Sequence, residues 1–299
     1  MAERGAEDAQ RGGLPYALGA YFLWGFLPLY MKLLHVLAPL AVLSHRILWS
    51  LPVVMAIMLA RGQWTEFRAA LSNRRAMLTM LASSTLISVN WLIYIYAIFD
   101  DHVLAASLGY YLNPLVNVLL GRLFLGERLT RLQGLAAAVA FAGVSILLFE
   151  ARDTLWISLS LAVSFGLYGL VRKVAPLGSV PGLAMEVSLL SPLALAGAIH
   201  FASDPQGFGS SARMTSLLMG SGLATAIPLL LFATAARRMS YTALGFVQYL
   251  APSIIFLLGA FVFHEPLDPA RIACFGLIWS AVAIFSFDAF QRMRREAGR

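Results

Sequence analysis

Long apolar runs are the feature that most restricts how this chain can fold. Ten such runs follow one another along the 299 residues, each bounded by charged or turn-forming residues. A helix needs about 20 residues, with a range of about 17–25, to cross a bilayer, so each run is long enough. The predicted spans are 15–34, 39–60, 76–99, 103–125, 132–149, 155–171, 181–201, 214–236, 242–263 and 269–290. The sequence therefore predicts an all-α integral membrane protein with ten transmembrane helices.

Composition agrees with a membrane protein and excludes a large soluble domain. The chain is 60% hydrophobic and 12% charged, whereas soluble domains carry about 25% charged residues. A net charge of +7 would suggest nucleic acid in a soluble protein, but arginines beside membrane spans set orientation instead. The single cysteine, Cys274, excludes an internal disulfide and a thiolate cluster. We expect no nucleic-acid partner, no metal and no cofactor.

The distribution of basic residues predicts the orientation of the spans. If the N-terminus is cytoplasmic, the segments on that side hold 17 of the 22 Lys and Arg residues. Basic flanks resist translocation, so both the tail 1–14 and the basic tail 291–299 are expected in the cytoplasm. The 17 residues are Arg4, Arg11, Arg61, Arg68, Arg74, Arg75, Arg122, Arg128, Arg131, Arg172, Lys173, Arg237, Arg238, Arg292, Arg294, Arg295 and Arg299.

The segment 61–75 has two possible structures. Trp64, Phe67 and Leu71 occur there at helical spacing among arginines. This pattern fits a helix lying along the inner headgroups, and it fits a solvated loop equally well. The sequence leaves both alternatives open.

The chain also contains an internal repeat. Four residues at the end of the first half recur 138 residues later, and the pairs are Pro114 with Pro252, Gly121 with Gly259, Glu127 with Glu265 and Leu129 with Leu267. A single offset near half of the chain length is what a duplication leaves behind. Each half, 15–150 and 151–290, has five predicted spans. Because five is an odd number, the second copy enters the membrane from the opposite side, and such inverted repeats are typical of carriers.

Polar and aromatic residues within the spans are the candidates for a substrate cavity. Such groups are costly in a bilayer and usually face protein or a water-filled space. Asn90 and Tyr94 lie one helical turn apart, as do Asn113 and Asn117. The predicted cavity residues are Trp24, His45, Arg46, Asn90, Trp91, Tyr94, Tyr110, Asn113, Tyr168, Glu186, Gln248 and Tyr249. Proline in mid-span interrupts backbone hydrogen bonding, so Pro114 and Pro252 are predicted hinges.

The two charged candidates, Arg46 and Glu186, allow two interpretations. Arg46 could attract a carboxylate and Glu186 an ammonium, or both could contact backbone carbonyls near the membrane surface. Their opposite depths argue against a direct ion pair between them. An aromatic and amide lining with few fixed charges favours amphipathic zwitterions or neutral molecules of modest size. Phosphorylated substrates are disfavoured because they would need a cluster of central basic residues.

Seven stretches carry a family resemblance across nearly the whole chain. They are AYFLWGFLPLY from Ala20, SHRILWS from Ser44, NWLIYIYA from Asn90, ASLGYYLNPLVN from Ala106, FLGERL from Phe124, SFGLYGLVRK from Ser164 and LGFVQYLAP from Leu244. Together they resemble the EamA-type members of the drug/metabolite transporter superfamily, and most closely the RarD-type proteins. The resemblance implies two inverted EamA repeats around a central cavity, in a multi-pass protein of the bacterial inner membrane. The resemblance to the related YddG-type exporters of this superfamily implies amino-acid export.

The sequence therefore predicts that the protein is a secondary transporter and that it is not an enzyme. It would export amino acids or similar small amphipathic metabolites by alternating access, down their gradient. Proton-coupled efflux of drugs is the alternative, with Glu186 as the proton carrier. An intramembrane enzyme would need a nucleophile with a base, or a metal cluster, and a channel would need a continuous polar pore. The expected partners are a small-molecule substrate and the lipid bilayer, with a monomer favoured.

Overall fold

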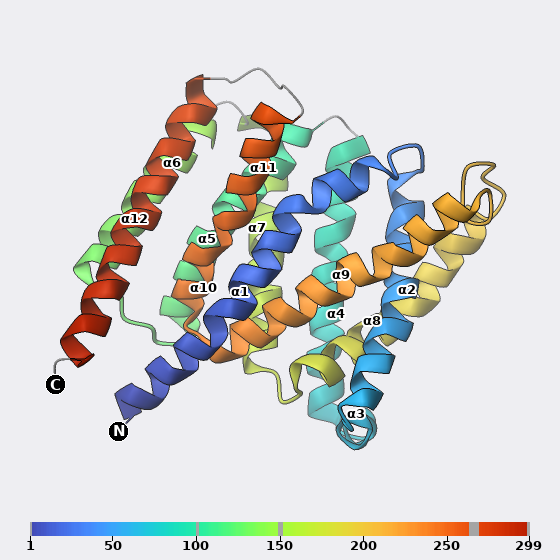
Figure 1. Ribbon diagram of the computed structural model, residues 1–299, viewed down its shortest axis with the longest axis horizontal. Helices are drawn as coiled ribbons and strands as arrows, with labels where there is room; N and C mark the ends of the chain where they lie inside the picture. Colours follow the sequence, from blue (N-terminus) through green and yellow to red (C-terminus); the bar gives the residue numbers. More distant parts are fainter. Residues whose placement is uncertain (1, 100–101, 149–151, 263–268, 298–299) are drawn as a thin grey trace.

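The computed structural model describes residues 2–99, 102–148, 152–262 and 269–297. Within these ranges the chain is helical and contains no strand (Figure 1). The elements are α1 (Ala2–Lys32), α2 (Pro39–Ala60), α3 (Trp64–Leu71), α4 (Arg74–Phe99), α5 (Val103–Phe124), α6 (Arg131–Leu148), the 3-10 turn η1 (Arg152–Thr154), α7 (Leu155–Val174), α8 (Ser179–His200), α9 (Ala212–Arg238), α10 (Tyr241–Gln248), α11 (Leu250–Phe261) and α12 (Pro269–Ala297).

The prediction of an all-α membrane protein is confirmed, but the count of ten spans is matched only in part. Within the described residues, eight segments are long and apolar enough to cross a membrane. The predicted spans 15–34 and 103–125 are not among them, although they lie on α1 and α5. α1 also begins at Ala2, so the predicted tail 1–14 is largely continuous with the first span.

The segment 61–75 contains a helix rather than only a loop. Its helix, α3, buries Phe67 and Ala70 while Trp64 stays 41% exposed. The carboxylate of Glu66 accepts a hydrogen bond from the backbone N–H of Gly178, with 2.7 Å between N and Oε1. The amphipathic pattern therefore holds α3 against α4 and α8 at the end of the bundle where the N-terminus lies (Figure 1).

Helices of the two halves of the chain pack mainly on each other. α6 lies against α12 along one edge of the molecule, whereas α2 lies against α8 and α9 toward the opposite edge (Figure 1). Between them, α1 contacts α9 and α11, α4 contacts α7 and α8, and α5 contacts α7 and α10. Small residues allow the α6–α12 approach, because a Cβ added at Gly143 would lie 2.9 Å from Leu277 Cβ.

The crossing of α2 and α9 is closer still. A Cβ added at Gly222 would lie 2.2 Å from the carbonyl carbon of Trp49 and 2.4 Å from its oxygen. The hydroxyl of Ser50 donates to the carbonyl oxygens of Arg46, at 2.6 Å, and Gly222, at 3.1 Å. The backbones of α2 and α9 thus come into contact at Gly222, because glycine has no side chain to keep them apart.

Glu127 connects the loop after α5 to the start of α10. Its two carboxylate oxygens accept the backbone N–H groups of Tyr241, at 2.6 Å, and Thr242, at 2.8 Å. The first N–H groups of a helix have no partner within the helix, and the helix dipole favours a negative charge there. A residue of the first half therefore caps a helix of the second half.

We expect Glu127→Ala to lower the free energy of unfolding by about 1–2 kcal/mol, because it removes two charge-assisted hydrogen bonds to a helix start. Unfolding of the purified protein in detergent measures the change. Arg128→Gln is the matched control in the same loop, since Arg128 is exposed and surface changes usually stay within about 0.5 kcal/mol. Equal stability of the two variants would contradict the capping role.

Candidate functional site

A cavity of about 680 Å³ lies among the central helices. Its wall is made of residues from α1, α2, α4, α5, α7, α9, α10 and α11, together with the segment after α1. Two of the lining residues, Lys32 and His35, are exposed at the end of α1. The cavity therefore reaches the surface at the end of the bundle away from the N-terminus.

Helical periodicity explains which side chains face the cavity. On α4 the lining residues are Ile87, Asn90, Trp91 and Tyr94, which follow the three-four spacing of a single helix face. The same spacing holds for Gln248, Ala251, Pro252 and Ile255 on the α10–α11 segment. Each of these segments thus presents one continuous stripe to the space.

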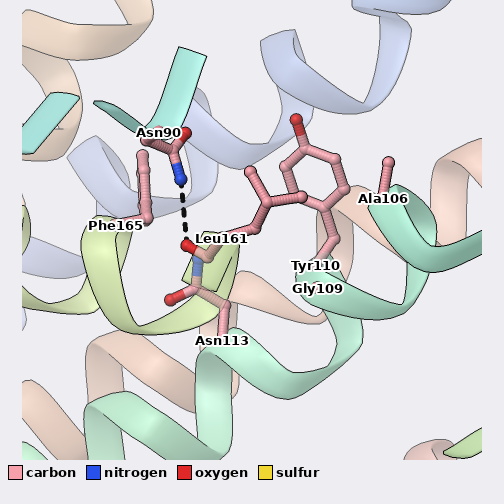
Figure 2. A pocket seen from close by; sticks show the side chains of 7 residues that line it. All are labelled: Asn90, Ala106, Gly109, Tyr110, Asn113, Leu161 and Phe165. Atoms are coloured by element: carbon pink, nitrogen blue, oxygen red, sulfur yellow. Dashed lines mark hydrogen bonds between the residues drawn. The ribbon is translucent and has the colours of Figure 1, made fainter. Parts of the chain in front are cut away.

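Two amide side chains bind helices together at the cavity wall. Asn90 Nδ2 donates to the carbonyl oxygen of Leu161 at 2.9 Å and to Ser164 Oγ at 3.0 Å, which joins α4 to α7. Figure 2 shows this amide above Leu161, with Tyr110 and Phe165 close by. The amides predicted from sequence as cavity residues are thus used, at least partly, to hold the wall in place.

Gln248 plays the corresponding role between α10, α5 and α1. Its Oε1 accepts hydrogen bonds from Asn117 Nδ2 at 2.9 Å and from the Tyr21 hydroxyl at 3.4 Å. All three side chains are at least 95% buried. α10 ends at Gln248, and Pro252, four residues later, has no N–H to donate to the carbonyl oxygen of Gln248.

Arg46 is the cationic group of α2 and lies in the second turn of that helix. Its Nε donates to Thr225 Oγ1 at 2.9 Å, and Thr225 in turn donates to the carbonyl oxygen of Ser221. The phenol groups of Tyr94 and Tyr110 lie near enough to interact with the arginine charge. These two rings meet edge to face with centroids 6.1 Å apart.

Aromatic rings close the inner end of the cavity. Trp24 and Phe165 line it, with ring centroids 5.8 Å apart. Behind them lie Phe232 and Tyr168, which are at most 1% exposed and stacked with centroids 6.0 Å apart. Tyr21 packs against Trp24 and Phe232 in the same cluster. We call these five residues the aromatic floor.

A buried ion pair lies beyond the aromatic floor. Arg172 Nε is 3.5 Å from Glu186 Oε1, and the two side chains are 0% and 2% exposed. Ser83 donates a hydrogen bond to Glu186 Oε1 and the Tyr168 hydroxyl donates to Oε2 at 3.4 Å. Arg172 also donates to the carbonyl oxygen of Ser179 at 2.9 Å. These contacts join α4, α7 and α8 on the side of the cavity where the N-terminus lies.

The sequence analysis counted Arg172 only among the basic residues of the cytoplasmic side, and the structure adds that its side chain is buried and paired with Glu186. α7 continues to Val174, three residues past the predicted end at 171, and this places Arg172 against α8. Room for its guanidinium comes from Gly182, where an added Cβ would lie 2.0 Å from Nη1. A partner on another helix is not visible in local hydropathy.

The structure brings together part of the predicted site. Seven predicted residues and one predicted hinge line the cavity, namely Trp24, Arg46, Asn90, Trp91, Tyr94, Tyr110, Gln248 and Pro252. His45, Asn113, Tyr168, Glu186, Tyr249 and Pro114 do not line it.

The residues outside the cavity have identifiable surroundings. The His45 ring stacks on Phe208 with centroids 5.2 Å apart, because neighbouring residues of a helix point in different directions and Arg46 faces the cavity. Asn113 is 2% exposed beside a small pocket next to Asn90 (Figure 2). Tyr249 is 2% exposed, and Pro114 lies within a continuous α5.

Sequence reasoning missed twelve lining residues. Several of them lie on the same face of α1 as Trp24. Tyr21 lies one turn before Trp24, Pro28 lies one turn after it and Lys32 lies two turns after it. Thr225 lies one turn after Ser221 in the predicted span 214–236, and this spacing was the signal available in the sequence. The twelve are Tyr21, Leu27, Pro28, Met31, Lys32, His35, Ile87, Phe165, Thr225, Leu229, Ala251 and Ile255.

Comparison with known proteins gives consistent similarities. The model of the EamA-like transporter family matches residues 11–149. An uncharacterized transporter of Pseudomonas aeruginosa is 41% identical over 95% of this chain and 96% of its own length. Protein RarD of Streptomyces exfoliatus is 42% identical over 98% of this chain and 94% of its own. The chloramphenicol-sensitive protein RarD of Pseudomonas aeruginosa is 33% identical over 96% and 97%.

Solved structures agree on the fold. A crystal structure superposes with a TM-score of 0.72 at 20% sequence identity, covering 94% of this chain and 98% of the other. At this identity the likeness concerns the fold alone.

Proposed function

Because this chain belongs to the EamA-like transporter family, we propose that it is a secondary carrier of amino acids or similar small amphipathic metabolites. It is a multi-pass membrane protein of a family of transporters. The proposal further places it in the bacterial inner membrane with both termini in the cytoplasm. Its direction is export, driven by the substrate gradient.

One observation carries the proposal. The cavity reaches the surface at one end of the bundle and is closed toward the other by the aromatic floor and the Arg172–Glu186 pair. A carrier must bind its cargo from one side while the other side is sealed, whereas a channel needs a continuous polar path. With the proposed orientation, the cavity described here opens toward the outside.

The pattern of helix contacts supports inverted repeats. In an inverted repeat, the helices of the first half correspond in order to those of the second: α1 to α7, α2 to α8, α4 to α9, α5 to α10–α11 and α6 to α12. The contact between α1 and α9 then has its counterpart in the contact between α7 and α4. The contacts α2–α9 and α8–α4 are likewise counterparts, as are α5–α7 and α11–α1. Contacts α2–α8, α6–α12 and α5–α10 join equivalent helices. If each repeat adopted the conformation of the other, the cavity would close at its present opening and open at the opposite end of the bundle.

The placement of Glu186 favours facilitated transport over proton coupling. Its carboxylate lies outside the cavity and is already engaged by Arg172, Ser83 and Tyr168. A coupling carboxylate has to alternate between the two sides of the membrane. The described contacts give Glu186 a positioning role within the closed end instead.

Flux through liposomes tests the carrier function. Purified protein is reconstituted into vesicles loaded with unlabelled amino acid, and accumulation of the labelled amino acid from outside is followed. Counterflow above the level of protein-free vesicles is expected for at least one member of a panel of the twenty amino acids and chloramphenicol. Absence of exchange across the whole panel would overturn the carrier proposal.

Gln248→Leu is expected to reduce counterflow about tenfold, which corresponds to about 1.4 kcal/mol. Leucine cannot accept the hydrogen bonds of Asn117 and Tyr21, so the cavity wall between α10, α5 and α1 loses its fixed geometry. The rate of labelled uptake into matched vesicles measures the effect. Gln291→Leu, the same change on α12 outside the cavity, serves as the control, and equal rates for both variants would show that Gln248 does not shape the transport path.

A further inference from the structure

We propose that Arg46 selects a carboxylate, so that the cargo is an organic acid with an aromatic or apolar body and needs no ammonium group. This inference rests on the proposed function, because it assigns the cargo class of the same cavity. It concerns which of the two charges of an amino acid the protein recognises.

The charges along the cavity wall all have one sign. Arg46, Lys32 and His35 are its ionisable bases, and no Asp or Glu is among the described residues that line it. A cleft lined by one sign of charge raises the local concentration of the opposite ion. Lys32 and His35 are exposed at the mouth of the cavity, and Arg46 lies deeper in its wall.

Arg46 carries hydrogen-bond capacity that its surroundings leave unused. Its Nε bonds to a neutral hydroxyl, that of Thr225, and no described carboxylate forms an ion pair with it. The guanidinium has five N–H donors, arranged as a fork that matches the two oxygens of a carboxylate. A cation within a membrane span needs an anionic or polar partner. The cavity is the place from which such a partner can come.

Arg172 shows how the same chain treats an arginine with a purely structural role. The protein supplies Arg172 with its own carboxylate, Glu186, and removes both groups from solvent. Arg46 receives no such counter-ion among the described residues and stays only partly buried. Because Glu186 is occupied by Arg172, it is also not free to bind the ammonium of a cargo.

The body of the cargo would face aromatic rings. Tyr94 and Tyr110 lie beside Arg46 and line the cavity, with exposed fractions of 36% and 45%. Trp91 is on the same stripe as Tyr94, and Trp24 and Phe165 form the bottom. Ring faces bind apolar and aromatic groups, and phenol hydroxyls can donate to a carboxylate. A cavity of about 680 Å³ is in the range that holds one small organic molecule.

Four compounds that share a phenyl ring test the inference on the wild-type protein. L-Phenylalanine has both charges, 3-phenylpropanoate has only the carboxylate, 2-phenylethylamine has only the ammonium, and L-phenylalaninamide has an amine without a carboxylate. Binding to the detergent-solubilised protein is measured by calorimetry. The two carboxylates are expected to bind at least tenfold more tightly than the other two compounds. Equal or tighter binding of the amine or the amide, or failure of 3-phenylpropanoate to bind, would overturn the inference.

Variants at Arg46 locate the selectivity. Arg46→Gln should abolish the tenfold preference for carboxylates, and Arg46→Lys should keep part of it, because the charge remains while the planar fork is lost. Arg213→Gln removes an exposed arginine at the start of α9 and is the matched control. If Arg46→Gln does not fold, the lysine variant and the wild-type panel still decide. An unchanged preference in folded Arg46→Gln would contradict the role of Arg46.

Failure of this inference differs from failure of the carrier proposal. Counterflow of amines or amides with equal efficiency would leave a carrier of another specificity and would overturn only the carboxylate selection. If none of the four compounds binds and no member of the flux panel exchanges, both proposals fall.

Discussion

Glu186→Gln is expected to lower the free energy of unfolding by about 3–5 kcal/mol, the largest loss among the substitutions considered for this protein. Glutamine keeps one acceptor oxygen, whereas Ser83 and Tyr168 donate to the two different oxygens of the carboxylate, and it removes the charge that compensates Arg172. A guanidinium that is 0% exposed then stays buried without a counter-ion. Unfolding of the solubilised protein, followed by circular dichroism in increasing denaturant, measures the loss.

The double variant Arg172→Met with Glu186→Gln is the control for this interpretation. It removes both charges, and replacement of a whole buried ion pair by neutral groups is often nearly neutral in stability. We therefore expect the double variant to be more stable than Glu186→Gln alone. Losses that simply add would show that the two side chains act independently. The same single variant checks proton coupling, because a transport rate that responds to pH in wild type and not in Glu186→Gln would contradict facilitated transport.

Gly222→Ala is expected to cost about 3 kcal/mol, the second largest effect. The new methyl group would lie 2.2 Å from the Trp49 carbonyl carbon, and a backbone atom cannot turn aside as a side chain can. α2 and α9 must therefore separate, and overpacking of this kind costs about 1–3 kcal/mol, sometimes more. The separation also weakens the bond from Ser50 to the Gly222 carbonyl.

Gly276→Ala provides the matched comparison for Gly222→Ala. A Cβ added at Gly276 meets no atom within 4 Å, so the substitution adds the same methyl group to a membrane helix without a clash. Alanine also favours helix over glycine by about 0.5–1 kcal/mol. Thermal unfolding of both variants in the same detergent should show a loss for Gly222→Ala alone. Equal midpoints would mean that the helices adjust freely at this crossing.

The fold was predictable because apolar length is a local property. Within the described residues, nine of the ten apolar runs lie on one helix each, since a bilayer requires about 20 residues whatever surrounds them. The run 242–263 was predicted as one helix and is divided at Tyr249. Pro252 supplies a reason for that break, but Pro114 leaves α5 continuous, so a proline alone does not decide whether a helix divides.

The site was less predictable because it depends on neighbours distant in sequence. Periodicity placed Asn90, Trp91 and Tyr94 on one face, and that face does line the cavity. Chemistry alone suggested Glu186 for the cavity, but Arg172 binds it from α7, and no local pattern marks this pairing. Tyr21 was missed because an aromatic residue in an apolar run looks the same whether it faces lipid, a packed core or a cavity.

The mutual packing of the two halves bears on how the polypeptide is made. α1, α2 and α4 rest mainly on α7, α8, α9 and α11, which the ribosome delivers only later. The first spans are therefore in the lipid before their partner helices are made. At that stage Arg46 lacks its hydrogen bond to Thr225, and Asn90 lacks its hydrogen bond to Leu161. Insertion into the membrane and assembly of the helix bundle are thus expected to be separate stages for this molecule.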